Sequence, residues 1–423
     1  MLKKFFRLFL VVLMTFLAIG VFASGGQEKK AAGKIELQMW RGSREQVWTD
    51  YFIAVCERFN AKHPNINVVT VETGGNDLDT KLNTAFAAGS APDMISTGIY
   101  NIAHRAGSGQ FAPIDEYFNK WSAKDDLLES VIELGKYKGK QYGVGFFPDP
   151  KLFFYRKDYF QAAGLDPNKT PTTWEELADY AVKLVKKEGG EVKVAGFDIN
   201  PQDFYVITAL IYQNGGLLAD EMADMPVWDS PAAIEALQFL TDFNKKGVAF
   251  PITAGGKGNI FRNPYYTDQA AMAFATMYGV QGIVRDKPEL KNKMVVAPPL
   301  KRKQQATFSG LNFNFISTST THKEECWEFI AFFMTKEETW DRYKLTTVPV
   351  VFKSMKDDYM KADPENQTIF DSILVARGLP KVVWSGRNLD FLKQATEEAL
   401  YGVKTPAQAA KDNVAALKKE LGK

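Results

Sequence analysis

The sequence has only three histidines and two cysteines, and its residues form no familiar catalytic motif. The three histidines, His63, His104 and His322, are not spaced like metal ligands. Residues 255–258 place a lysine among glycines without the spacing, or the following Ser or Thr, of a phosphate-binding loop. A pair of carboxylates that cleaves a glycoside stays open, because the fold sets the distance between them. We therefore expect no metal and no cofactor, and a binding role ahead of an enzymatic one.

A second kind of chemistry is indicated by aromatic rings that lie beside polar groups near predicted chain turns. Flat rings can cover the C–H faces of a sugar, while Arg, amide and carboxylate groups can bond its hydroxyls. The candidates are Trp40 with Arg41, Tyr278, and Trp384 with Arg387. For each ring the alternative is ordinary packing, since Trp40 could close the first strand against the core and the others could be buried supports.

Four further residues lie in turns where they could touch a bound solute. Asp149, flanked by prolines, could accept hydrogen bonds from ligand hydroxyls or be a solvated turn residue. Gly310 would let backbone N–H groups approach a solute closely, or would serve an ordinary turn. Asp77 and Asp79 precede a predicted helix, where a capping role is the simpler interpretation.

The elements that position these residues begin with an alternation of strands and helices. Ile35, Leu37 and Met39 alternate as in a strand, and strands and helices are predicted in turn at 46–60, 67–71, 78–88 and 94–95. This order is typical of a parallel α/β sheet, in which ligands meet the loops at the carboxyl ends of the strands. Residues 40–43 and 96–99 lie at two such ends.

A second α/β unit is predicted after residue 170. Glu176 follows Thr173 by three residues, which indicates a capped helix start, and Pro231 lies in the first turn of another helix. The predicted helices are 174–187, 204–213 and 230–246, with strands at 194–197 and 271–276. Later helices are predicted at 323–334, 337–344, 390–401 and 406–421, the last three on the second lobe or across its back.

The stretch 142–157 holds two apolar and aromatic runs separated by Pro148, Asp149 and Pro150. That punctuation favours paired or crossing strands over a helix. We interpret it as the first passage between two lobes, and the proline-marked apolar run 295–299 as the passage back. About 400 residues exceed what one core usually serves, which also favours two lobes.

The first 23 residues predict a signal peptide. Lys3, Lys4 and Arg7 precede an apolar run at 8–22, and small residues follow it. An uncleaved membrane anchor is the alternative, although the run is short for a span. We therefore expect an exported protein.

The charge balance excludes some classes of binding partner, and the two cysteines bear on whether a disulfide forms. The chain has 52 Lys and Arg residues and 50 Asp and Glu residues. Without the three basic residues of the leader, 49 basic residues remain against 50 acidic ones. This balance argues against nucleic acid or an anionic membrane surface as the partner. Cys56 and Cys326 each lie on an apolar helical stripe, and a bridge between them stays open in an exported protein.

Several segments, in this order and spacing, resemble one family across nearly all of the mature chain. They are Phe59-Asn60 with 64–68, 82–93, 155–158 with 163–166 and 171–177, Ala271-Met272, 325–330 and 402–406. They resemble the extracellular solute-binding proteins of ATP-driven importers, in the branch that includes maltose-binding and other sugar-binding proteins. Trp40 and Arg41 match a region where such proteins commonly touch ligand, and Tyr278 falls where relatives often carry Trp.

The resemblance implies an α/β, two-lobed periplasmic-binding-protein fold with crossing hinge segments and a cleft between the lobes. The expected divisions are 1–23 signal peptide, 24–147 and 299–335 lobe 1, and 148–298 and 336–423 lobe 2 with the C-terminal helices. It also implies a monomer that captures a sugar, an oligosaccharide or glycoside first, and delivers it to the membrane permease of an ABC importer. The alternatives are another small polar solute, such as a glycerol-phosphate compound, polyamine or compatible solute, and a secreted glycosidase.

Overall fold

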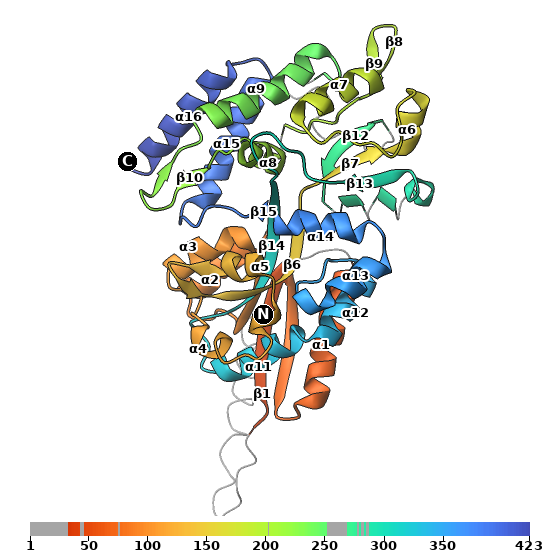
Figure 1. The fold of residues 1–423 in the computed structure, drawn as a ribbon. Helices are drawn as coiled ribbons and strands as arrows, with labels where there is room; N and C mark the ends of the chain where they lie inside the picture. The colour runs from red at the N-terminus through yellow and green to blue at the C-terminus, as the bar shows by residue number, and fades with distance from the viewer. Residues whose placement is uncertain are drawn as a thin grey trace, which may run out of the picture.

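The computed structural model describes residues 33–42, 46–74, 77–201, 203–251, 269–276, 279–280, 283–284 and 287–423. They form two α/β lobes stacked along the long axis of the molecule, lobe 1 below and lobe 2 above in Figure 1. The predicted fold class is therefore confirmed. The expected leader, 1–23, and Tyr278 lie outside the described residues. Among the described residues, no helix combines the length and the apolar character that a bilayer crossing requires.

The sheet of lobe 1 joins strands from distant parts of the sequence. Its strands are β1 (Ile35–Gly42), β2 (Ile66–Thr73), β3 (Met94–Gly98), β6 (Gly143–Pro150), β14 (Thr307–Ile316) and β15 (Ala376–Arg377). The order is β15-β14-β3-β1-β2, with β6 also paired to β14. β1 runs parallel to β2 and β3, as the alternation of strands and helices predicts, whereas β14 is antiparallel to β3 and β6. The sheet thus brings the carboxyl ends of β1 and β3 to one edge.

Helices cover this sheet with stripes of apolar side chains. They are α1 (Gln46–Lys62), α2 (Leu78–Ala87), α3 (Ile102–Gly107), α4 (Asp115–Phe118), α5 (Glu129–Leu134), α11 (Lys323–Phe333), α12 (Lys336–Thr346) and α13 (Lys356–Ala362). On α1 the buried positions recur every three or four residues, from Trp48 to Phe59. Phe59 meets Phe329 of α11 edge to face at 5.2 Å. Cys56 and Cys326 are free and buried on these helices, and burial raises the pKa of each thiol to about 12.

The predicted position of residues 337–344 on the second lobe is wrong, because α12 packs against α1 in lobe 1. Arg342 Nη1 donates to the Tyr51 hydroxyl at 2.9 Å, and Arg58 Nε donates to Glu338 at 2.8 Å. Further along the chain, α14 (Asn366–Leu374) lies at the waist in Figure 1. The exact residues that divide the lobes stay a prediction.

Lobe 2 is built around a short sheet of β12 (Met272–Ala275), β7 (Leu152–Arg156) and β13 (Met294–Ala297), with β7 in the middle and antiparallel to both neighbours. Its helices are α6 (Lys157–Ala162), α7 (Trp174–Leu184), α8 (Phe204–Gln213), α9 (Pro231–Lys246), α15 (Ser385–Leu400) and α16 (Pro406–Glu420). The remaining strands are short and are paired in sequence order: β4 (Lys136–Tyr137) with β5 (Lys140–Gln141), β8 (Lys186–Glu188) with β9 (Glu191–Val194), and β10 (Ala219–Asp220) with β11 (Met225–Pro226).

Local signals in lobe 2 predict helix starts better than helix ends. The Thr173 side chain accepts from the Glu176 N–H at 3.2 Å, and the Thr172 N–H donates to the Glu176 carboxylate at 2.7 Å, so the predicted start is confirmed. The predicted end at 187 is wrong, because α7 stops at Leu184 and β8 pairs with β9. Gly189 and Gly190 have φ of 57° and 86°, which suits a tight hairpin turn rather than a helix end.

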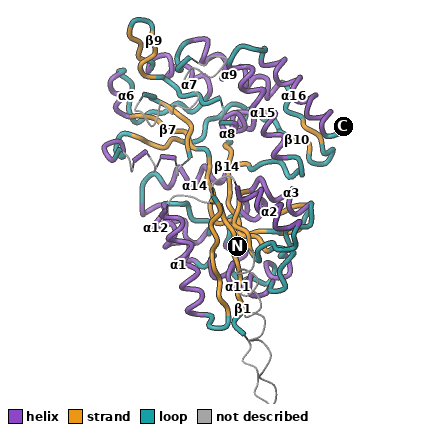
Figure 2. The backbone as a smooth tube through the Cα atoms, turned by 180° about the vertical axis from the view of Figure 1, so that it is seen from behind, coloured by secondary structure: helices purple, strands orange, loops and turns teal. Residues whose placement is uncertain are grey.

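Two antiparallel strands, β6 and β14, carry the chain between the lobes. Figure 2 shows β14 running from the sheet of lobe 1 toward lobe 2. The residues paired across these strands include Asp149 with Gly310 and Phe147 with Asn312. The predicted return at 295–299 is wrong, because β13 pairs with β7 inside lobe 2 and the return is made by β14. The passage at 142–157 is found as β6 followed directly by β7.

Candidate functional site

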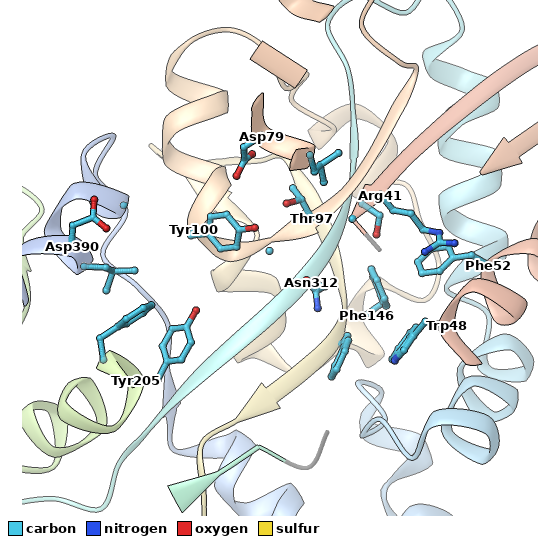
Figure 3. Close-up of a pocket in the computed structure, with 18 residues that line it drawn as sticks. Arg41, Trp48, Phe52, Asp79, Thr97, Tyr100, Phe146, Tyr205, Asn312 and Asp390 are labelled. Atoms are coloured by element: carbon cyan, nitrogen blue, oxygen red, sulfur yellow. The ribbon is translucent and has the colours of Figure 1, made fainter. Parts of the chain in front are cut away.

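A cavity of about 630 Å³ lies between the two lobes, where the carboxyl ends of β1 and β3 face lobe 2. Figure 3 shows side chains of both lobes around it. Lobe 1 and the crossing strands contribute Arg41, Gly42, Trp48, Phe52, Leu78, Asp79, Ser96, Thr97, Gly98, Tyr100, Phe146, Phe147 and Asn312. Lobe 2 contributes Phe204, Tyr205, Gly386, Leu389 and Asp390. The strand ends predicted at 40–43 and 96–99 therefore do reach a cavity.

Arg41 is a predicted site residue that does line the main cavity. It is only 2% exposed, and its Nη2 pairs with Glu72 at 2.6 Å while its Nε donates to the Thr70 hydroxyl at 3.1 Å. The Thr49 hydroxyl donates to the same carboxylate at 2.6 Å; this bond and the bonds from Arg41 lower the pKa of Glu72. Nη1 is buried without a hydrogen-bond partner among the described residues. Arg41 therefore keeps one donor that a bound oxygen could satisfy.

Asp79 lines the cavity from the first turn of α2, and a buried arginine holds its carboxylate. Arg105 Nη2 donates to Asp79 Oδ1 at 2.7 Å, and Arg105 itself is 1% exposed. Asp77 precedes the helix without a side-chain capping bond, so the capping interpretation of these aspartates is wrong. Tertiary pairing with Arg105, which no local pattern shows, decides how Asp79 is held.

Aromatic rings reach the cavity from both lobes. Tyr100, on the 3-10 turn Ile99–Asn101 after β3, is 43% exposed, and its ring lies over Gly98, where a Cβ would be 2.6 Å from it. Tyr205, at the start of α8, stacks on Phe308 with ring centroids 4.4 Å apart. Burial raises the pKa of the Tyr205 hydroxyl, and the nearby Tyr100 hydroxyl raises it further. The cavity is thus lined by Tyr100 from lobe 1 and by Tyr205 from lobe 2.

Buried aromatic rings support the lobe 1 side of the cavity. Trp48 is 1% exposed and stacks on Phe147 at 4.9 Å with 12° between the ring planes. Phe52 lies under the Arg41 guanidinium, 5.0 Å from ring centroid to Cζ. A helical apolar stripe predicts these residues as core, and only the fold shows that their edges also line a cavity.

A smaller compartment of about 150 Å³ adjoins the main cavity on the hinge side. It shares Gly98, Tyr100, Tyr205 and Asn312 with the main cavity and is also lined by Ile99, Asp149, Lys151, Thr276, Phe308, Gly310 and Leu311. Asp149 and Gly310 are direct partners across the crossing strands. The structure therefore brings together two residues that the sequence had singled out 161 positions apart, by the difference of their numbers.

Three other predicted residues do not line either compartment. Trp40 donates through Nε1 to Gln38 at 3.2 Å and packs against the core of lobe 1. Trp384 is 5% exposed, donates to Asp224 at 2.7 Å and packs in a small cluster with Val382 and Leu417, so it is a packing residue.

Arg387 also points away from the cavity, although it shares a helix with lining residues. Its guanidinium pairs with Glu420 and with Asp390, each at 2.7 Å, and these carboxylates raise its pKa. Gly386, Leu389 and Asp390 of the same helix line the cavity. Arg387 lies three residues before Asp390 and pairs with it, but the guanidinium also reaches Glu420 of α16, which lies outside the cavity lining.

Comparison with known proteins gives the same architecture. The family model described as "Bacterial extracellular solute-binding protein" matches residues 46–340. A maltotriose-binding protein of Pyrococcus abyssi is 24% identical over 357 residues, 79% of this chain and 72% of the relative. An sn-glycerol-3-phosphate-binding periplasmic protein of Escherichia coli is 25% identical over 232 residues, 53% of this chain and 52% of the relative. A solute-binding protein of Thermotoga lettingae, solved with alpha-D-tagatose, superposes with a TM-score of 0.79 at 23% identity, over 91% of this chain and 99% of that chain.

Proposed function

Because the chain belongs to the family of bacterial extracellular solute-binding proteins, we propose that it binds an oligosaccharide or glycoside between its lobes and delivers it to the permease of an ABC importer. The observation that carries the proposal is the interlobe cavity with tyrosine rings from both lobes and buried polar groups between them. The binding of maltotriose by a similar protein supports a sugar as the solute. Export through the leader at 1–23, and action as a monomer, belong to the same proposal.

The size and lining of the cavity suit a sugar of more than one ring. Its volume of about 630 Å³ lies within the range of about 300–1,000 Å³ that is usual for small-molecule sites. Tyr100 and Tyr205 offer flat faces for C–H groups. Asp79, Asn312 and the Arg41 Nη1, which has no partner among the described residues, offer partners for hydroxyls. In the hinge-side compartment, Asp149 and the backbone at Gly310 would take a further hydroxyl-rich part of the ligand.

A glycerol-phosphate compound is the second candidate, and Arg41 is the observation that favours it. A guanidinium with an unused N–H bonds phosphate oxygens well. Against it, Glu72 already balances the charge of Arg41, and Asp79 places a carboxylate in the same cavity. A neutral polyhydroxylated ligand therefore fits the charges better than a dianion.

Calorimetric titration with maltotriose, mannobiose, D-tagatose and sn-glycerol-3-phosphate tests these alternatives. We expect saturable binding of at least one oligosaccharide, and chromatography of the incubated sugar should show no product. Tight binding of sn-glycerol-3-phosphate with none of the sugars bound would support the second candidate. Release of shorter sugars would overturn the binding role in favour of a glycosidase.

A further inference from the structure

Lys151 is a buried lysine at the point where β6 passes into β7, and it is only 7% exposed. Its backbone N–H donates to the Phe308 carbonyl at 2.7 Å, and its own carbonyl accepts from the Thr307 hydroxyl. Thr307 and Phe308 are the first residues of β14. The backbone of Lys151 is therefore bound to the strand that returns the chain to lobe 1.

The side chain of Lys151 reaches a third element. Its ammonium pairs with Asp203, whose side chain is 18% exposed and which is the N-cap of α8. The Asp203 carboxylate also accepts from the Tyr205 N–H at 3.2 Å. A buried ammonium is tolerated because a carboxylate pairs with it, so Lys151 and Asp203 depend on each other.

These contacts form a closed circuit around Tyr205. From Tyr205 the circuit runs through its N–H to Asp203, through the ion pair to Lys151, and through a backbone hydrogen bond to Phe308. It returns to Tyr205 by ring stacking, with centroids 4.4 Å apart and 13° between the planes. Tyr205, one of the residues that line the cavity from lobe 2, is thus tied to the crossing strands at both its backbone and its ring.

We propose that Lys151 is a positioning residue for the cavity: through its ion pair with Asp203 it holds the first turn of α8 and sets the orientation of Tyr205 toward lobe 1. Its effect on solute affinity rests on the proposed function, whereas its effect on α8 does not. The crossing strands and the first turn of α8 should then move together. A ligand that contacts and shifts Tyr205 should therefore also shift the strands that cross between the lobes.

A neighbouring carboxyl is affected by this ion pair. Burial, and then the charge of Asp203, raise the pKa of Asp198 to about 7, and Lys151 opposes the shift.

Hydrogen exchange of the ligand-free protein, followed by mass spectrometry, tests the positioning role. We expect Lys151→Met and Asp203→Asn each to speed exchange at the start of α8 at least about tenfold, because each breaks a buried ion pair. Asn keeps an oxygen that can cap the helix, so Asp203→Asn removes the pair without removing the cap. Lys151→Arg should restore most of the protection, and the double variant should exchange little faster than the faster single variant.

Lys193→Met is the matched control, because Lys193 is an exposed lysine of lobe 2 that pairs with Glu191 at 2.8 Å. It should leave exchange at α8 unchanged. Unchanged exchange at α8 in Lys151→Met and Asp203→Asn would overturn the proposal. An equal rise in α8 and in the distant α16 would also overturn it, since that pattern reports general destabilisation.

The affinity arm uses whichever sugar of the titration panel binds wild type. We expect Lys151→Met to weaken binding about tenfold, with a smaller loss in Lys151→Arg. If wild type binds none of the panel, the proposed function fails while the exchange result still decides the role of Lys151. Unchanged affinity in Lys151→Met, with faster exchange at α8, would show that Tyr205 does not need this position to bind.

Discussion

Arg41 serves both the core and the cavity of lobe 1. Two of its nitrogens bond Thr70 and Glu72, its plane lies over Phe52, and the third nitrogen is buried without a partner among the described residues. An unsatisfied buried donor costs free energy, and a ligand oxygen that reaches it recovers this cost on binding. A ligand oxygen at this position should therefore gain binding free energy by satisfying a donor that the fold leaves unpaired.

Arg41→Lys should weaken ligand binding about tenfold while costing little stability, because Lys keeps a charge for Glu72 but cannot supply the fork of donors. Calorimetry with the bound sugar and a thermal melt measure the two effects. Arg302→Lys is the control, since Arg302 is an ion-paired surface residue outside the cavity. Unchanged affinity in Arg41→Lys would remove Arg41 from the site.

Asp198 predicts a pH dependence of stability. Its pKa is raised from 3.8 to about 7 in the fold, so the folded state binds this proton more tightly than the unfolded chain does. That contribution is complete below about pH 4 and is lost as the pH rises to about 7. Between about pH 5 and pH 8, wild type should lose about 1–2 kcal/mol relative to Asp198→Asn. Urea denaturation of both proteins at the two pH values measures this loss, and an equal difference at both would contradict it.

At the scale of elements, the site depends on where strands end and helices begin. Arg41 and Gly42 end β1, Gly98 ends β3, and Tyr205 lies in the first turn of α8. Parallel pairing of β1 with β3 brings the first two ends to one edge. Side chains at such ends project into the cleft, while the strand interiors pack in the core.

The end of β3 yields a test of this arrangement. A methyl at Gly98 would lie 2.6 Å from the Tyr100 ring, and the half-exposed ring could move aside. Gly98→Ala should therefore displace Tyr100 and weaken binding several-fold, with a change in unfolding free energy below about 1 kcal/mol. Gly33→Ala is the matched control, because a Cβ there meets nothing within 4 Å and Gly33 lies outside the cavity. Equal affinities in both variants would mean that the position of Tyr100 does not matter.

Elements were predictable where the signal is local. The capped start of α7 and the proline at the start of α9 are confirmed, since side chains within four residues satisfy the helix N–H groups. The apolar run at 295–299 was correctly predicted as a strand, but the prediction that it returns the chain to lobe 1 is wrong. Its partner is β7, which lies about 140 residues earlier in the chain. A strand's own residues do not specify which distant strand it joins.

At the scale of the whole molecule, we propose that the crossing strands couple ligand binding to a change of shape. The cavity takes Tyr100 from lobe 1 and Tyr205 from lobe 2, so a ligand that touches both rings stabilises the arrangement in which they are close. X-ray scattering should show a smaller radius of gyration with saturating ligand. Tyr205→Ala should reduce that change and the affinity, and Arg302→Lys, at a surface residue outside the cavity, should alter neither. An unchanged radius at saturation in wild type would count against hinge closure.

The sequence by itself determined the α/β class, the two lobes, the first crossing at 142–157 and the family, because periodicity, caps and motif order are local and survive without a structure. It also identified Arg41, Asp149 and Gly310, which lie at strand ends or on crossing strands and line the cleft. Only the tertiary structure decided that Trp384 and Arg387 face away, that Tyr100, Tyr205 and Asp79 face in, and that β14 makes the return. Those outcomes depend on contacts between residues far apart in the chain, which no local pattern encodes.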